Sequence, residues 1–152
     1  MKLAEALIMR ADYQKRVEQL RHRLAQNVRV QEGEEPNEDP KELMIELEQI
    51  LKQLKTLIQK INRTNLKTSF DEKRTLADAL TERELIGQER RIFSELATQA
   101  AVRHDRYSRS EIKSISTINV KETQKRVDDL SQDYRKIDTR IQELNWLTDL
   151  AE

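Results

Sequence analysis

The chain has 152 residues, of which 37% are charged and only 4% are aromatic, with two glycines and two prolines. Lysine plus arginine number 28 and so do aspartate plus glutamate, so overall charge gives no reason to expect a nucleic acid or an anionic membrane as partner. The absence of cysteine excludes disulfides, thiol catalysis and thiolate metal sites, and it agrees with a reducing, cytoplasmic location.

This composition is typical of an all-α protein with a thin core. Few helix breakers and many Glu, Lys, Arg, Gln and Leu residues favour helices. With only 36% hydrophobic residues, the buried surface must be a seam between helices, and thin cores often gain burial by self-association. We therefore expect a single helical-bundle domain over residues 1–152 that forms a homo-oligomer.

The N-terminal stretch and the uncharged runs argue against export and membrane insertion. Glu5 interrupts the first apolar run and Arg10 closes it, so no secretory signal is predicted. The uncharged runs elsewhere are far shorter than the roughly 20 apolar residues of a spanning helix.

The first predicted helix runs from about residue 3 to residue 28. Its three-four stripe is typical of one buried face, with Arg10 as the odd member: Leu3, Ala6, Arg10, Tyr13, Val17, Leu20 and Leu24. Residues 29–40 follow as an acidic linker, in which Gly33 and Pro36 break regular structure and the glutamates favour a solvated loop.

The second predicted helix, residues 39–66, has the strongest pattern. Asp39 suits the N-cap, Pro40 the first helical position, and Glu42 lies three residues after the cap. Its seam consists of Leu43, Leu47, Ile50, Leu54, Leu57 and Ile61. A second apolar row of Met44, Leu51 and Ile58 predicts that this helix touches two or more neighbours.

Two further helices are predicted after a short polar turn at residues 67–74. One begins at Thr75, with Asp78 in the reciprocal capping position, and runs to about residue 102. Gly87 inside it either permits a close helix approach or is simply tolerated. The other begins after Asn119 and continues to the C-terminus. The loop between them, residues 104–119, could contain a short β-ribbon.

Four antiparallel helices of nearly equal length are compatible with two architectures. One is an up-down-up-down bundle, and the other is a pair of helical hairpins that splay apart and associate with a second chain. Both bury the same seams, so the sequence leaves both open.

Antiparallel counting predicts a polar layer near the chain termini. Residues that share this level are Asn62, Arg63, Asn65, Asp78, Asn145 and Trp146, with Glu5 close by. Buried polar groups in helical seams often fix register and subunit pairing, and that is the role we expect here. A small-molecule or ion site is the alternative.

A second candidate site is the loop formed by Arg103, Arg106, Tyr107, Ser108 and Arg109. Arginine and serine can bond phosphate oxygens, and tyrosine can stack on a base. The simpler interpretation is that this basic loop attracts the acidic linker 29–40, within one chain or between subunits.

No catalytic, metal or cofactor site is predicted. A di-iron bundle needs Glu-x-x-His on two helices, but the residues three before His22 and His104 are Gln19 and Ala101. The two glycines cannot form a phosphate-binding loop. The chain is therefore not expected to be an enzyme.

Several segments resemble a family of small bacterial proteins, some of which carry the cytolysin name septicolysin. They are VQEGEEPNEDP (30–40), KINRTN (60–65), RTLADALTERE (74–84), RYSRSEIK (106–113) and IQELNW (141–146). The resemblance spans nearly the whole chain, carries over no catalytic residue, and implies membrane damage.

Three functional hypotheses follow from the sequence. The first is a non-enzymatic oligomeric helical scaffold or binding protein, with a protein partner possible. The second is a septicolysin-like pore-forming or membrane-damaging protein. The third is nucleic-acid or phosphate binding through the Arg103–Arg109 loop, although the neutral charge argues against a nucleic-acid partner.

Overall fold

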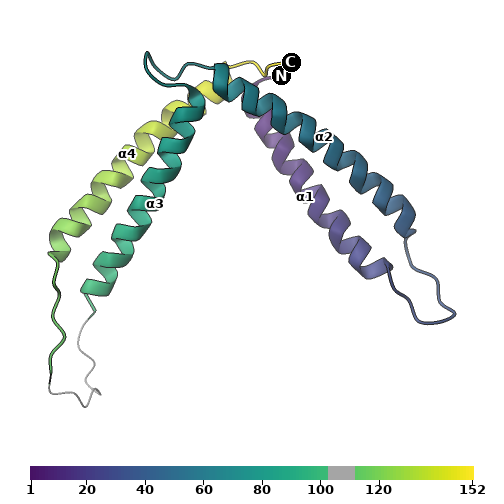
Figure 1. The fold of residues 1–152 in the computed structure, drawn as a ribbon, viewed down its shortest axis with the longest axis horizontal. Helices are drawn as coiled ribbons and strands as arrows, with labels where there is room; N and C mark the ends of the chain where they lie inside the picture. Colours follow the sequence, from purple (N-terminus) through teal and green to yellow (C-terminus); the bar gives the residue numbers. More distant parts are fainter. Residues whose placement is uncertain (103–111) are drawn as a thin grey trace. The chain divides into compact units, whose positions relative to one another are not determined.

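The structure, a computed structural model, describes residues 1–102 and 112–152. It contains four helices: α1 (Leu3–Asn27), α2 (Pro40–Lys67), α3 (Leu76–Ala100) and α4 (Val120–Leu147) (Figure 1). The predicted all-α class and its four long helices are confirmed. The short β-ribbon is not found in the described residues of the two long loops.

The chain divides into two compact units. Unit 1 comprises Met1–Ser69 and Glu143–Glu152, and unit 2 comprises Phe70–Gln142. Unit 1 contains the hairpin of α1 and α2 with the end of α4, whereas unit 2 contains the hairpin of α3 and the rest of α4 (Figure 1). Each unit is therefore organised around one antiparallel helix pair.

The core of unit 1 is the predicted seam between α1 and α2. Leu20, Leu43 and Ile50 are buried, and partly buried apolar residues pack against them. Further along α2, Leu57 and Ile61 are buried as well. On α2 these residues follow one another at steps of seven, seven and four, which keeps them on one face of the helix, so the seam is narrow and continuous.

The helix starts follow the sequence signals. The Asp39 side chain accepts a hydrogen bond from the Lys41 amide at 2.9 Å, and Pro40 occupies the first position of α2. Thr75 and Asp78 form the reciprocal capping box of α3, and these hydrogen bonds from Thr75 lower the pKa of Asp78. Asn119 accepts from the Glu122 amide at 3.1 Å before α4.

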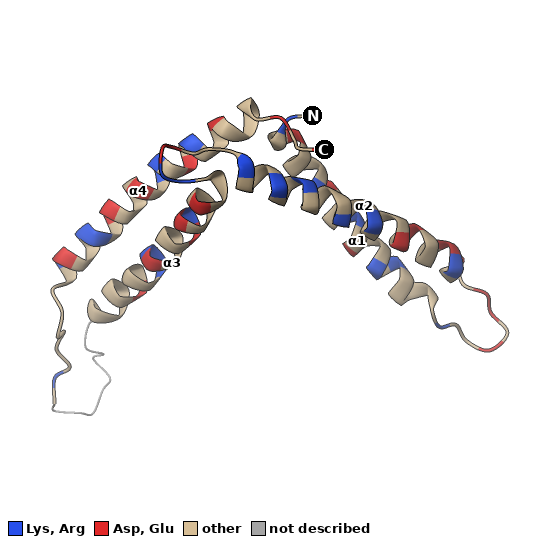
Figure 2. Cartoon of the chain, turned by 45° about the horizontal axis from the view of Figure 1, so that its top comes forward, with Lys and Arg blue, Asp and Glu red and all other residues tan. Residues whose placement is uncertain are grey.

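The acidic linker between α1 and α2 is tied to its own hairpin. The side chain of Asn27, which is buried, donates to the Arg23 carbonyl at 2.8 Å and accepts from the Glu38 amide at 3.0 Å. Arg23 also bonds both carboxylate oxygens of Glu38, which lowers the pKa of Glu38. This end of the linker is therefore anchored, although its other glutamates are exposed, as predicted. Figure 2 shows the linker as an acidic stretch, in red.

In unit 2, a close approach and two ion pairs connect α3 with α4. A Cβ atom added at Gly87 would lie only 3.3 Å from Cε2 of Tyr134, so the glycine permits this contact. Arg83 bonds Asp138 at 2.6 Å. Arg126 bonds Glu89 at 2.9 Å and lies over the Phe93 ring at 4.1 Å, which adds a cation–π contact.

The turn before α3 is organised by Asp71. Its carboxylate accepts hydrogen bonds from the amides of Lys73 and Arg74 and from the Arg74 guanidinium. The bond from the Arg74 side chain is the main cause that lowers the pKa of Asp71 to about 2. Arg74 also bonds Glu82 in the first turns of α3, so the turn is fixed to the helix that follows it.

The Asp71→Asn variant should lose stability at neutral pH but not in strong acid. The folded-state pKa of about 2 lies below the usual value of about 3.9, so this carboxylate stabilises the fold above pH 4. That contribution disappears as the pH falls from about 4 to about 2. Urea unfolding followed by circular dichroism across this range should show the gap between wild type and variant closing. The matched control is Glu72→Gln, and a gap that stays constant with pH would contradict this role.

Candidate functional site

The N-terminal and C-terminal segments of unit 1 pair with each other in extended conformation. The Leu3 amide donates to the Thr148 carbonyl at 2.9 Å, and the Leu150 amide donates to the Met1 carbonyl at 2.8 Å. These bonds flank the antiparallel bridge between Lys2 and Asp149. The prediction that the last helix continues to the C-terminus is therefore wrong, because residues after Leu147 pair with the other terminus instead.

Side chains reinforce this terminal pairing on both sides. The Lys2 ammonium lies 2.8 Å from the Asp149 carboxylate, and this contact lowers the pKa of Asp149. On α2, the hydroxyl of the buried Thr64 accepts from the Ala151 amide at 2.9 Å and donates to the Lys60 carbonyl at 2.8 Å. The C-terminal segment is thus held against the start of α1 and against α2. We call this set of bonds the terminal clip.

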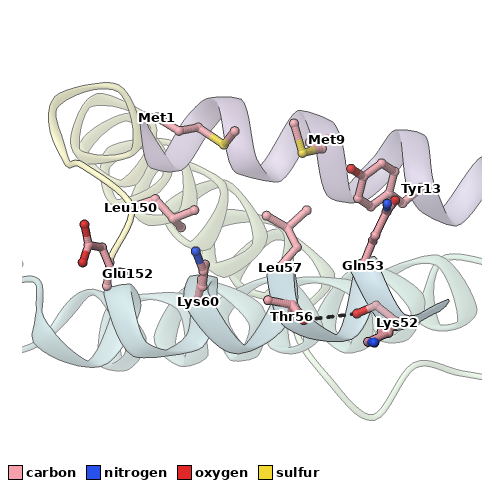
Figure 3. A pocket seen from close by; sticks show the side chains of 11 residues that line it. Met1, Met9, Tyr13, Lys52, Gln53, Thr56, Leu57, Lys60, Leu150 and Glu152 are labelled. Carbon is pink, nitrogen blue, oxygen red and sulfur yellow. Dashed lines mark hydrogen bonds between the residues drawn. The ribbon is translucent and has the colours of Figure 1, made fainter. Parts of the chain in front are cut away.

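The terminal clip closes one end of a groove between α1 and α2. The groove has a volume of about 650 Å³. Its apolar wall includes Met9, Leu57 and Leu150, while Tyr13 and Gln53 lie together toward the other end (Figure 3). The full lining is Met1, Met9, Tyr13, Lys52, Gln53, Thr56, Leu57, Lys60, Leu150, Ala151 and Glu152.

The α2 side of this groove belongs to a cationic stretch. Between Gln49 and Phe70 the sequence has no carboxylate, and its cations are Lys52, Lys55, Lys60, Arg63 and Lys67. They appear as a series of basic residues along this half of α2 (Figure 2). None of them forms an ion pair among residues 1–102 and 112–152. Lys52 and Lys60 line the groove, and Glu152 is the carboxylate side chain on its rim.

The residues of the predicted polar layer have different environments. Within unit 1, Asn145 is buried and Asn65 is half-buried, whereas Asn62 and Arg63 are exposed and Trp146 is 56% exposed. Asp78 belongs to unit 2, where it caps α3 through Thr75. The shared hydrogen-bonded layer and its role in subunit pairing stay a prediction.

The second candidate site belongs to the segment between α3 and α4. Arg103, Arg106, Tyr107, Ser108 and Arg109 lie outside the described residues. Their attraction to the acidic linker and their binding of phosphate both stay predictions.

The groove is the site that sequence reasoning missed. Two signals for it were present in the sequence: the absence of carboxylates between Gln49 and Phe70, and the place of Thr64 inside the polar cluster that ends α2. The pairing of the termini left no periodic signal, because only a few residues on each side take part.

The structure gives no sign of a metal centre or a membrane-spanning helix in the part of the chain that it describes. Within residues 1–102 and 112–152, no group of His, Asp and Glu side chains is arranged to hold a metal ion. No helix there combines the length and the apolarity that crossing a membrane requires.

The fold and groove describe a small all-α protein made of helical hairpins, and comparison with known proteins places it in a family. Residues 10–150 match the model of a family of unknown function, DUF6847, and the chain belongs to this family. It is also similar to a crystal structure described as a functionally unknown conserved protein from Corynebacterium diphtheriae. The two are 44% identical, with a TM-score of 0.93 and 99% of each chain covered. No curated protein matches the chain.

The Thr64→Val variant should release the C-terminal end of the terminal clip. Valine keeps the shape of threonine but cannot accept from the Ala151 amide, so that amide loses its partner. We expect amide hydrogen exchange at Ala151 to become about tenfold faster, with little change in the helix amides of α1. Thr56→Val on the same helix is the control, since Thr56 bonds only within its own turn. Unchanged exchange at Ala151 would contradict the role given to Thr64.

Proposed function

We propose that this chain is a non-enzymatic, oligomeric helical protein that acts as a scaffold or binding module. The observation that carries the proposal is that apolar rows on two helices are left uncovered in the single chain. Exposed apolar rows of this kind are typical of surfaces that another protein covers.

The first uncovered row lies on α2. Met44 and Leu51 are 47% and 44% exposed, and half-buried Ile58 continues the row at the same seven-residue spacing. The sequence predicted that this row would meet a second neighbour. The seam with α1 uses other residues of α2, so the row remains free to pack against a further helix.

The second uncovered row lies on α3 in unit 2. Leu85, Ile92 and Leu96 are 56%, 47% and 45% exposed, at steps of seven and four residues. Such steps keep them on one side of the helix. A second copy of the chain could cover either row by helix-to-helix packing, which is how a protein with narrow internal seams gains further apolar burial.

The titratable groups support binding over catalysis. Catalytic groups commonly combine a shifted pKa with a place in a cleft. Among the described residues, the carboxylates with lowered pKa values are Glu38, Asp71, Asp78 and Asp149, and each takes part in an ion pair or a helix cap. None of them lines the groove between α1 and α2.

The Leu51→Gln variant should weaken self-association. We expect wild type to sediment as a dimer or larger species at micromolar concentration, with a dissociation constant raised about tenfold or more by the polar side chain. Ile8→Gln is the matched control, because Ile8 is similarly exposed, at 55%, but stands alone on α1. Ile92→Gln tests the α3 row in the same way. Wild type that sediments only as a monomer would overturn the oligomer.

A membrane-damaging function is the second candidate, in line with the resemblance to proteins named septicolysin. The observation that favours it is a set of exposed apolar side chains in unit 1: Leu66, Trp146 and Leu147 are 64%, 56% and 63% exposed. Tryptophan and leucine are typical of the apolar face that an interfacial helix buries in a lipid surface. The scaffold proposal instead assigns these residues to protein contacts.

Vesicles containing a trapped dye distinguish the two candidates. Because Trp146 is the single tryptophan, its fluorescence reports directly on this region. The scaffold proposal predicts no dye leakage and no blue shift of Trp146 emission with anionic or neutral vesicles. Leakage with a blue shift, both lost in a Trp146→Ser, Leu147→Ser double variant, would favour membrane damage instead.

The third hypothesis, nucleic-acid or phosphate binding through Arg103–Arg109, concerns residues outside the described part of the chain and stays a prediction.

A further inference from the structure

The groove between α1 and α2 has the size and composition of a ligand site. Its volume of about 650 Å³ falls within the usual range of roughly 300–1,000 Å³ for small-molecule sites. Met9, Leu57 and Leu150 give it an apolar wall, contributed by α1, α2 and the C-terminal segment (Figure 3). Methionine side chains are flexible and polarisable, so they can adapt to an elongated apolar group.

The polar groups of the groove are unevenly distributed along it. Lys60 projects from α2 between the two helices, on the side where Leu150 and Glu152 close the groove (Figure 3). Toward the other end lie the neutral polar groups of Tyr13 and Gln53, with Lys52 beside them on the side of α2 that faces away from α1 (Figure 3). A ligand with one charged end and a long apolar remainder matches this order.

The positive charge of the groove wall favours a ligand whose charged end is an anion. Lys52 and Lys60 line the groove, and neither forms an ion pair among the described residues. The neighbouring Lys55, Arg63 and Lys67 add to the positive potential of this half of α2, which contains no carboxylate to offset it. The Glu152 carboxylate would repel an anionic ligand, so removing its charge should strengthen the binding of such a ligand.

From these observations we propose that the groove binds a free, single-chain carboxylate amphiphile. The carboxylate lies at Lys60, with Lys52 contributing long-range attraction, and the acyl chain runs along Leu57 and Met9 toward Tyr13. This site is separate from the self-association proposed above, since Met44, Leu51 and the α3 row do not line the groove. Loss of the oligomer would therefore leave amphiphile binding in place.

Calorimetric titration of the full chain with dodecanoate, kept below its micellar concentration, tests the proposal. We expect saturable binding of one molecule per chain for dodecanoate. Acetate, which has the head without the tail, should give no saturable binding. Dodecyltrimethylammonium, which has the tail with a cationic head, should bind at least threefold more weakly than dodecanoate.

Charge variants on one helix locate the carboxylate. Lys60→Gln should weaken dodecanoate binding by roughly threefold to fivefold, which is typical of a partly exposed charge contact. Lys55→Gln removes the same charge from α2 but at a residue that does not line the groove, so its effect should be smaller. Glu152→Gln removes the repulsion and should tighten binding.

A second pair of variants locates the acyl chain on α1. Met9→Gln places a polar amide in the groove wall and should weaken binding several-fold, whereas Ile8→Gln, at an exposed position outside this groove, should not. Circular dichroism confirms that each variant is folded before titration.

Three results would overturn the proposal. They are the absence of saturable dodecanoate binding, equal effects of Lys60→Gln and Lys55→Gln, and equal affinity for the anionic and cationic amphiphiles. Dodecanoate that acts only by disrupting bilayers, with no binding in the absence of vesicles, would favour the membrane-damaging candidate instead.

Discussion

The narrow apolar seam between paired helices is the constraint on which the rest of this structure depends. In unit 1 the seam is essentially one row of apolar residues on α2 packed against one row on α1. The α2 row includes Leu43, Ile50 and Ile61. A seam of this width buries little apolar surface per residue, so polar contacts must fix the remaining geometry. The Arg23–Glu38 pair at one end of the hairpin and the Thr64–Ala151 bond at the other fill that role.

The same narrowness explains why apolar side chains remain on the outside. A helix with two apolar rows can cover only one of them against a single antiparallel neighbour. On α2, the row of Leu43 and Ile50 is covered by α1, and the row of Met44 and Leu51 is not. Self-association would bury this uncovered row, because it adds apolar contacts without lengthening the chain.

Much of the fold could be predicted from the sequence, because its strongest signals are local. The Asp39-Pro40 start of α2 and the Thr75–Asp78 box of α3 depend on a few neighbouring residues, and both are present in the structure. For Gly87 the sequence left two interpretations open, a close helix approach or a glycine that is simply tolerated. The contact with Tyr134 supports the close approach. The terminal pairing was not predicted, because it joins residues at opposite ends of the chain and leaves no periodic trace.

For the candidate site too, local features could be predicted from the sequence, whereas contacts between distant residues could not. The sequence singled out the Asn62–Asn65 cluster at the end of α2. It could not identify Thr64 as the member that is buried and bonded to Ala151, because that partner lies far away in the sequence. Composition also concealed the cationic stretch, since equal numbers of acidic and basic residues over the whole chain give a net charge of zero.

The helix dipole does not account for that cationic stretch. Cations near a helix C-terminus are stabilised by the dipole, but the effect falls off within the last turn. It can explain Lys67, which lies in the last turn of α2, but not Lys52 or Lys55, which lie several turns earlier. Elsewhere in the described residues some basic side chains, such as Arg23, Arg83 and Arg126, are paired with carboxylates, whereas others, such as Lys41 and Lys121, are simply exposed. An anionic ligand in the α1–α2 groove would neutralise Lys60, which lines the groove and forms no ion pair among the described residues.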